Sequence, residues 1–154
     1  MSEYIKNFPY KEIRDQQTDA IEFCMEEFKA GKRFVIIEAG TGVGKSAIGY
    51  TVSQTMAQMN PLTSDDVMPG SWFVTTQKLL QDQYIKDYDL LGMKSIKSSS
   101  NYQCRFKKYN TCADSQKELK VEEKGTRFWN ACVMKCVYKE AKESFLKSKV
   151  SVTN

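Results

Sequence analysis

Histidine is absent from this chain of 154 residues. Its absence excludes Ser-His-Asp and Cys-His catalysis, and it excludes zinc sites that use imidazole ligands. Long apolar runs are also missing, because the longest, Phe34 to Ile37, is far shorter than the roughly 18 residues of a membrane span. The first ten residues have no apolar core, so we expect no secretory signal, no membrane partner and a reducing, cytoplasmic compartment.

The composition is that of a folded protein with an uneven distribution of charge. Apolar residues make up 41% of the chain and aromatic residues 12%, which is enough to bury a core. Residues 1–93 carry 9 Lys and Arg against 13 Asp and Glu, whereas residues 94–154 carry 14 against 6. This division predicts that the C-terminal part either faces an anionic partner or carries a solvated, lysine-rich face.

Apolar periodicity predicts alternating helices and strands in the first half of the chain. Residues 11–30 have helical spacing, with Cys24 on the apolar face as a buried thiol, and residues 33–38 form a short β-branched run typical of a buried strand. The other expected elements are a helix over 46–59, a loop over 61–70, a strand over 72–76 and a helix over 77–89. This order is that of a parallel α/β sheet.

A glycine-rich loop, residues 38–46 (EAGTGVGKS), lies between the first predicted strand and the helix that follows. It has the P-loop pattern with alanine in place of the first glycine. Glycines let backbone N–H groups approach phosphate oxygens, and the helix directs its positive end at them. We therefore expect a nucleoside triphosphate and Mg²⁺ to bind at Ala39, Gly40, Thr41, Gly42, Val43, Gly44, Lys45 and Ser46.

Two residues of this loop are the expected catalytic residues. Lys45 is predicted to reach the β- and γ-phosphates, and Ser46 to supply a hydroxyl ligand to Mg²⁺. We find no carboxylate pair of a Walker B motif, which a P-loop motor requires. Asp65 and Asp66 lie in a predicted loop rather than at the end of an apolar strand, so we do not assign them this role.

Four of the five cysteines lie between residues 104 and 136. In a reducing compartment such clustering indicates a metal or an iron–sulfur cluster more than disulfide bonds. The expected ligands are Cys104, Cys112, Cys132 and Cys136. Their spacing alone leaves a [4Fe–4S] cluster and a Cys₄ zinc site as equal alternatives, with unliganded thiols as a third. A helix predicted over about 127–148 would place Cys132 and Cys136 on one face.

The region around these cysteines is basic and rich in aromatic residues. Cations beside aromatic rings are typical of a surface that binds single-stranded nucleic acid. Alternatively, the rings form a packing shell around the cysteines. The residues concerned are Arg105, Lys107, Lys108, Lys135, Lys139 and Lys142, with Tyr102, Phe106, Tyr109 and Tyr138.

Several segments, in this order along the chain, resemble the iron–sulfur superfamily 2 DNA helicases, the group of DinG and XPD. They are residues 14–17 (RDQQ), the loop AGTGVGKS, residues 72–83 (WFVTTQKLLQDQ), residues 97–104 (KSSSNYQC) and the segment after Cys136. Val137 departs from the family, which usually has proline there. The resemblance covers residues 14–154.

The resemblance implies an α/β fold: an incomplete RecA-like P-loop motor domain with an inserted, mainly helical four-cysteine module. Residues 1–93 would be the N-terminal part of the motor domain, 94–150 the iron–sulfur module and 151–154 the start of a truncated strand. The cofactors would be ATP, Mg²⁺ and a [4Fe–4S] cluster, with Zn²⁺ as the alternative. Arg14 and Gln17 would contact the nucleotide, with a glutamine reading the adenine edge.

The implied activity is that of an ATP-dependent DNA helicase, which couples ATP hydrolysis to translocation on single-stranded DNA and duplex unwinding. The partner would be single-stranded or forked DNA, contacted by Thr76, Lys78, Gln81, Arg105, Lys107, Lys108, Lys135 and Lys139. Without a Walker B region and a second motor domain, we expect these 154 residues to be inactive alone and to pair with the remaining helicase segments. The alternatives are a non-catalytic nucleic-acid-binding module with a structural Cys₄ zinc and, more weakly, a P-loop kinase or signalling NTPase.

Overall fold

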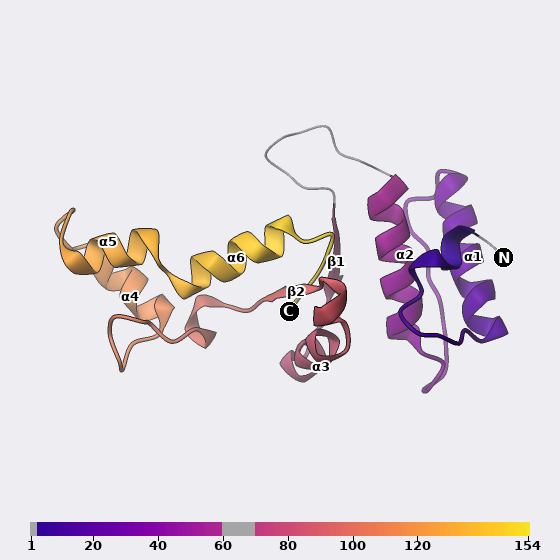
Figure 1. Ribbon diagram of the computed structural model, residues 1–154, viewed down its shortest axis with the longest axis horizontal. Coiled ribbons are helices and arrows are strands. Elements are labelled where there is room, and N and C mark those ends of the chain that lie inside the picture. Colours follow the sequence, from indigo (N-terminus) through magenta and orange to yellow (C-terminus); the bar gives the residue numbers. More distant parts are fainter. Residues whose placement is uncertain (1–2, 60–69) are drawn as a thin grey trace.

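The computed structural model describes residues 3–59 and 70–154. The protein is elongated, with two N-terminal helices at one end, a small sheet in the middle and a helical module at the other end (Figure 1). The loop expected over 61–70 lies outside the described residues except for Gly70, and so do Asp65 and Asp66. No helix in the described ranges is both long and apolar enough to cross a membrane.

The N-terminal end packs two helices around a small apolar core. A short 3-10 helix, η1 (Glu3–Asn7), precedes α1 (Asp15–Lys29) and α2 (Lys45–Met59), so both helices predicted here are confirmed. Ile21 and Met25 of α1 pack against Ile48 of α2. Cys24 is 7% exposed, as its place on the apolar face predicted, and burial raises the pKa of its thiol.

The sheet is parallel, as the order of elements predicted. Its strands are β1 (Ser71–Val74), β2 (Lys94–Ile96) and β3 (Val150–Thr153), in the order β1-β3-β2. Helix α3 (Lys78–Tyr88) and the 3-10 turn η2 (Asp89–Leu91) connect β1 to β2. The rings of Tyr88 and Tyr50 stack at 4.8 Å beneath the strands, which joins α3 to α2.

The strand expected over residues 33–38 is not formed. These residues run without regular structure between α1 and the phosphate loop, and in the described part of the chain no strand pairs with them. Phe34 is 84% exposed and Ile36 is 90% exposed, whereas Val35 and Ile37 face inward. The pattern of a buried strand is therefore present, but its hydrogen-bonding neighbours are not among the described residues.

The helices of the cysteine module differ from the single long helix that the sequence predicted. The module contains η3 (Ser99–Asn101), α4 (Cys112–Leu119), α5 (Arg127–Met134) and α6 (Val137–Lys147). The helix predicted over 127–148 breaks at Lys135, which leaves the helical region at φ −134°, so Cys132 and Cys136 do not share one helix face. Residues 94–96, at the start of the range expected for the module, form β2 and pair with β3.

Candidate functional site

The phosphate loop, residues 38–46, connects the extended segment 33–38 to the first turn of α2. Gly42 and Gly44 have φ angles of +83° and +85°, a region that residues with a Cβ rarely adopt. At Gly44 a Cβ would also overlap the side-chain amide of Gln17. These two glycines let the backbone turn tightly onto the N-terminus of α2, where unpaired N–H groups favour an anion.

Lys45 directs its ammonium group into the loop. Its Nζ donates hydrogen bonds to the carbonyl oxygens of Ala39 at 2.9 Å and Gly40 at 2.8 Å. Since the lysine stem is flexible and the group is solvent-exposed, phosphate oxygens can replace these carbonyl partners. Ser46, the expected Mg²⁺ ligand, follows in the first turn of the helix.

Helix α1 braces the phosphate loop from outside. The Oε1 atom of Gln17 accepts a hydrogen bond from the backbone N–H of Arg14 at 3.0 Å, and its Nε2 donates to the carbonyl of Val43 at 2.8 Å. The guanidinium of Arg14 donates to the carbonyl of Gly42 at 3.2 Å. Gln17 is 7% exposed with both ends of its amide engaged, so here it supports the loop, and its contact with the nucleotide stays a prediction.

A cavity of about 430 Å³ opens beside the phosphate loop. Thr41, Gly42, Gly44, Lys45 and Ser46 form one wall, and Leu80, Gln83, Tyr84 and Asp87 of α3 form the other. Burial raises the pKa of the Tyr88 phenol far above its ordinary value, while the Ser46 hydroxyl acts in the opposite direction. The four α3 residues that line this cavity were not predicted as site residues, because no local pattern reports how a helix packs against a distant loop.

The four clustered cysteines converge on a second, smaller cavity, in the module. Their side chains line it together with Ser115. Cys104, Cys112 and Cys132 are 9%, 3% and 8% exposed, Cys136 is partly exposed, and all four thiols are free. Residues from separate segments of the chain thus line one cavity, and their role as ligands stays a prediction.

The thiols of this cluster differ in acidity. Burial acts to raise the pKa of Cys104, but the Ser115 hydroxyl and the backbone N–H groups of Lys107 and Phe106 stabilise its thiolate and lower the pKa overall. Burial raises the pKa values of Cys112 and Cys132, and the nearby thiols raise them further. In the described part of the chain, no three His, Cys, Asp or Glu side chains are placed to hold one metal ion.

The residues expected to contact DNA have different environments. Thr76 and Lys78 are exposed beside the sheet, and the Nζ of Lys78 donates to Asn101 Oδ1 at 3.0 Å. Gln81 is 0% exposed, and its amide donates to the carbonyls of Ile96 and Val152 at 2.8 and 3.3 Å. Gln81, expected to contact DNA, is therefore buried here, and its amide nitrogen ties α3 to the strands.

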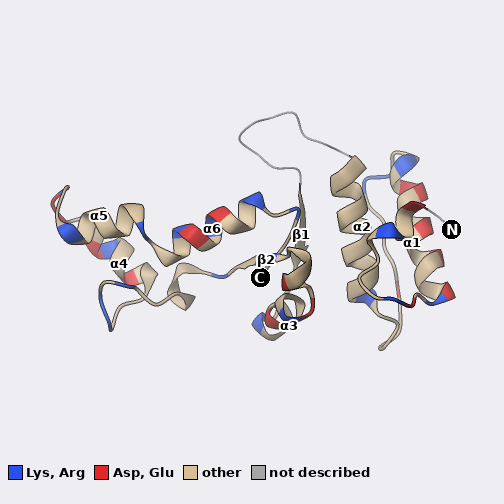
Figure 2. Ribbon diagram, viewed as in Figure 1, with Lys and Arg blue, Asp and Glu red and all other residues tan. Residues whose placement is uncertain are grey.

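Several of the expected cations of the module are already paired with carboxylates, and Figure 2 shows basic and acidic residues interspersed along its ribbon. Arg105 makes a bidentate ion pair with Glu140 at 2.8 and 2.9 Å. Lys107 pairs with Glu118, and its ammonium lies 4.3 Å from the centre of a phenylalanine ring. Lys108 lies over Tyr109, which is 90% exposed, and Lys135 and Lys139 are exposed at the cysteine cavity.

Comparison with protein families assigns the chain to a known domain. The family model described as "Type III restriction enzyme, res subunit", a superfamily 2 helicase-type domain, matches residues 10–149. This range contains the bracing residues of α1, the phosphate loop, β1, β2 and the four clustered cysteines. No match was found among the curated proteins or the solved structures. The chain therefore belongs to the family of type III restriction enzyme res subunits, an ATP-dependent motor family.

Proposed function

We propose that this chain is the nucleotide-binding N-terminal part of an ATP-dependent DNA helicase of the iron–sulfur type, acting on single-stranded or forked DNA. The observation that carries the proposal is the braced phosphate loop, in which Gln17 and Arg14 fix the backbone at Val43 and Gly42. A loop held from outside in this way keeps its N–H groups directed at phosphate oxygens. Family membership supports the coupling of this site to a nucleic-acid motor.

The residues of the loop have distinct roles in this proposal. Lys45 exchanges its carbonyl partners for the β- and γ-phosphates of ATP, and Ser46 contributes a hydroxyl to Mg²⁺. The main-chain N–H groups at the start of α2 bind phosphate oxygens. Asp87 and Tyr84 of α3 line the opposite wall of the adjoining cavity.

The four cysteines are proposed to hold a [4Fe–4S] cluster. Four cysteine thiolates are the donor set of both a [4Fe–4S] cluster and a structural zinc ion, and the resemblance to the iron–sulfur helicases favours the cluster. Four thiols lining one small cavity support this donor set. The cluster would hold α4, α5 and α6 together and supply electron-transfer chemistry.

The module is also proposed to bind single-stranded DNA. Lys108 presents positive charge next to the exposed ring of Tyr109, a combination that binds phosphates and stacks bases, and Lys135 and Lys139 add exposed charge at the cysteine cavity. Arg105 and Lys107 are engaged in ion pairs and contribute to this surface only after exchanging those partners for phosphates. Thr76 and Lys78 extend the proposed path towards the sheet.

One anaerobic preparation tests both proposed roles of the module, which are binding of the cluster and binding of single-stranded DNA. The proposal predicts a brown protein with iron and acid-labile sulfide, and single-stranded DNA binding that weakens steeply with salt, which fluorescence anisotropy measures. A colourless protein with stoichiometric zinc would replace the cluster by the Cys₄ zinc alternative. DNA binding that is absent at low salt would overturn the helicase proposal for the module.

A further inference from the structure

The phenol of Tyr88, the last residue of α3, is buried against α2. Its side chain is 0% exposed, and its ring stacks on that of Tyr50 at 4.8 Å with an angle of 12° between the ring planes. Tyr50 lies four residues after Ser46 on α2, so the two side chains share one face of this helix. Tyr88 therefore packs on the face of α2 that carries the expected Mg²⁺ ligand.

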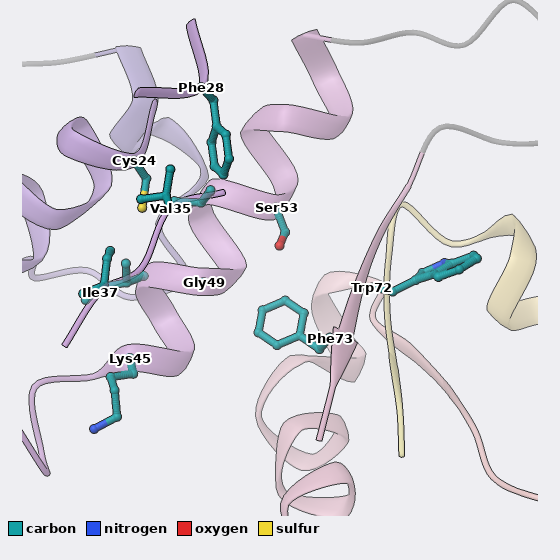
Figure 3. A pocket seen from close by; sticks show the side chains of 11 residues that line it. Cys24, Phe28, Val35, Ile37, Lys45, Gly49, Ser53, Trp72 and Phe73 are labelled. Atoms are coloured by element: carbon teal, nitrogen blue, oxygen red, sulfur yellow. The ribbon is translucent and has the colours of Figure 1, made fainter. Parts of the chain in front are cut away.

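Other aromatic rings hold Tyr88 in place. The ring of Tyr84 lies 6.4 Å from that of Tyr88, and the ring of Phe73 lies 5.3 Å from that of Tyr84. Phe73 points from β1 towards Gly49 of α2 (Figure 3), where a Cβ would come within 3.2 Å of the ring. Because these rings are packed between α2, α3 and β1, the Tyr88 hydroxyl has little freedom to turn towards solvent.

The hydroxyl groups of the two stacked tyrosines differ in their hydrogen bonding. The Tyr50 hydroxyl donates to the carbonyl of Leu91 at 3.1 Å and accepts from the amide of Gln54 at 2.9 Å. The Tyr88 hydroxyl, by contrast, makes no hydrogen bond to any described residue. An unpaired buried hydroxyl costs stability, so we expect it to gain a partner in another state of the protein.

The structure offers Ser46 as that partner. Burial raises the pKa of the Tyr88 phenol, whereas the Ser46 hydroxyl lowers it, which is the effect of a hydroxyl that donates to the phenol oxygen. The Tyr10 phenol acts to raise this pKa. Ser46 also lines one cavity with Tyr84 and Asp87, which places the end of α3 at the phosphate loop. The Tyr88 oxygen is thus a buried acceptor close to the Ser46 hydroxyl.

We propose that Tyr88 is a positioning residue, whose phenol oxygen accepts a hydrogen bond from the Ser46 hydroxyl when the Ser46 oxygen binds Mg²⁺. This inference rests on the proposed function, which assigns Ser46 to Mg²⁺. A hydroxyl that gives a lone pair to a cation becomes a stronger donor, and its hydrogen then needs an acceptor. Tyr88 supplies this acceptor, so the hydrogen bond orients the Ser46 oxygen and couples α3 to occupancy of the phosphate loop.

Tyr88→Phe tests the pairing, because it removes the hydroxyl and keeps the ring. Calorimetry on the whole chain gives the Mg²⁺ ratio, which is the ATP affinity with Mg²⁺ divided by that in excess EDTA. We expect this ratio to fall about tenfold, as on loss of a group that orients a metal ligand, while the affinity in EDTA changes less than about twofold. The urea midpoint of unfolding without nucleotide should stay the same or rise, because no hydrogen bond to a described residue is lost.

Tyr50→Phe is the matched control, since it removes the hydroxyl of the stacked partner, which does make hydrogen bonds. This variant should lower the unfolding midpoint and retain the Mg²⁺ ratio, the reverse of Tyr88→Phe. A double variant gives a second test. Ser46→Ala alone should lower the Mg²⁺ ratio, and adding Tyr88→Phe should change it no further, because the two residues act through one interaction.

Three results would overturn the inference: an unchanged Mg²⁺ ratio in Tyr88→Phe, additive effects of Tyr88→Phe and Ser46→Ala, or a Tyr88→Phe variant that is less stable and loses ATP affinity equally with and without Mg²⁺. The last would give Tyr88 a purely structural role, such as a hydrogen bond to Tyr10. Mg²⁺-dependent ATP binding by the unmodified chain would still support the proposed function in each case. ATP binding that is absent or independent of Mg²⁺ in the unmodified chain would contradict the proposed function, and this inference with it.

Discussion

The N-terminal unit and the cysteine module form their sites in different ways. The phosphate loop is nine consecutive residues whose shape depends on backbone angles at Gly42 and Gly44. The cysteine cluster is assembled from side chains on separate helices and loops, with Cys112 opening α4, Cys132 in α5 and Cys136 before α6. One site is local in sequence, and the other depends on the packing of the whole module.

Because the two sites form in these different ways, we expect that each can be lost without loss of the other. Helix α2 carries the phosphate loop and packs on α1 and β1, far along the molecule from the cysteine cavity (Figure 1). The module has few fully buried apolar side chains, and surface ion pairs and helix caps hold much of it. A bound cofactor would therefore contribute more to the module than a nucleotide contributes to α1 and α2.

The largest effect is expected for Cys132→Ser. Loss of one ligand should remove the cofactor and unfold the module, because metal or cluster binding is coupled to folding of a small core. Iron and zinc analysis with near-ultraviolet circular dichroism measures this loss, and ATP affinity should stay within about twofold of the starting chain. Cys24→Ser, which changes a buried thiol outside the cluster, is the control and should retain the cofactor.

Lys45→Ala should have the next largest effect. Removing the charge-assisted contacts to phosphate costs about 2–3 kcal/mol, so we expect about 100-fold weaker binding of Mg²⁺ and ATP with no change in cofactor content. Calorimetry measures the affinity. Lys32→Ala, at an exposed site after α1, should leave it unchanged. If Lys45→Ala also lost the cofactor, this result would contradict the expectation that the two sites are independent.

Gly44→Ala should destabilise the braced loop, with a smaller effect than Cys132→Ser or Lys45→Ala. A side chain in the left-handed region costs about 1–2 kcal/mol, and the new methyl group would displace the amide of Gln17. The free energy of unfolding in denaturant measures the effect. Gly40→Ala is the matched control, because a Cβ there meets no atom within 4 Å, and equal destabilisation of the two variants would contradict the bracing role of Gln17.

Lys108→Ala should have the smallest effect. If this side chain contacts a phosphate, its loss should weaken single-stranded DNA binding modestly and reduce the slope of log affinity against log salt by about 1. Lys32→Ala should retain the full slope. An unchanged slope in Lys108→Ala would remove this residue from the proposed DNA surface while leaving the nucleotide site unaffected.

Local features were predictable from the sequence, and tertiary ones were not. The helices α1 and α2, the glycine-rich loop and the buried Cys24 follow from spacing and residue type alone. The burial of Gln81 does not, because its amide nitrogen donates to carbonyls of two strands distant in sequence. Residues 33–38 have the composition of a strand, but whether a strand forms depends on neighbours that composition does not specify.

The cysteine cluster gives a second example of a tertiary arrangement that the sequence does not specify. The four thiols line one cavity, and their role as ligands stays a prediction, whereas the expected continuous helix carrying Cys132 and Cys136 is broken at Lys135. The Thr126 cap fixes the start of α5 without setting its end. The residue spacing therefore did not specify the backbone around Cys132 and Cys136.

Calorimetric titration of ATP into the unmodified chain, with Mg²⁺ and with excess EDTA, tests whether residues 38–46 bind a nucleotide. We expect weak but saturable binding at one site per chain, and weaker binding when EDTA removes Mg²⁺ from the Ser46 hydroxyl. Absence of saturable binding, or identical binding in EDTA, would contradict the assignment of residues 38–46 as a functional phosphate loop.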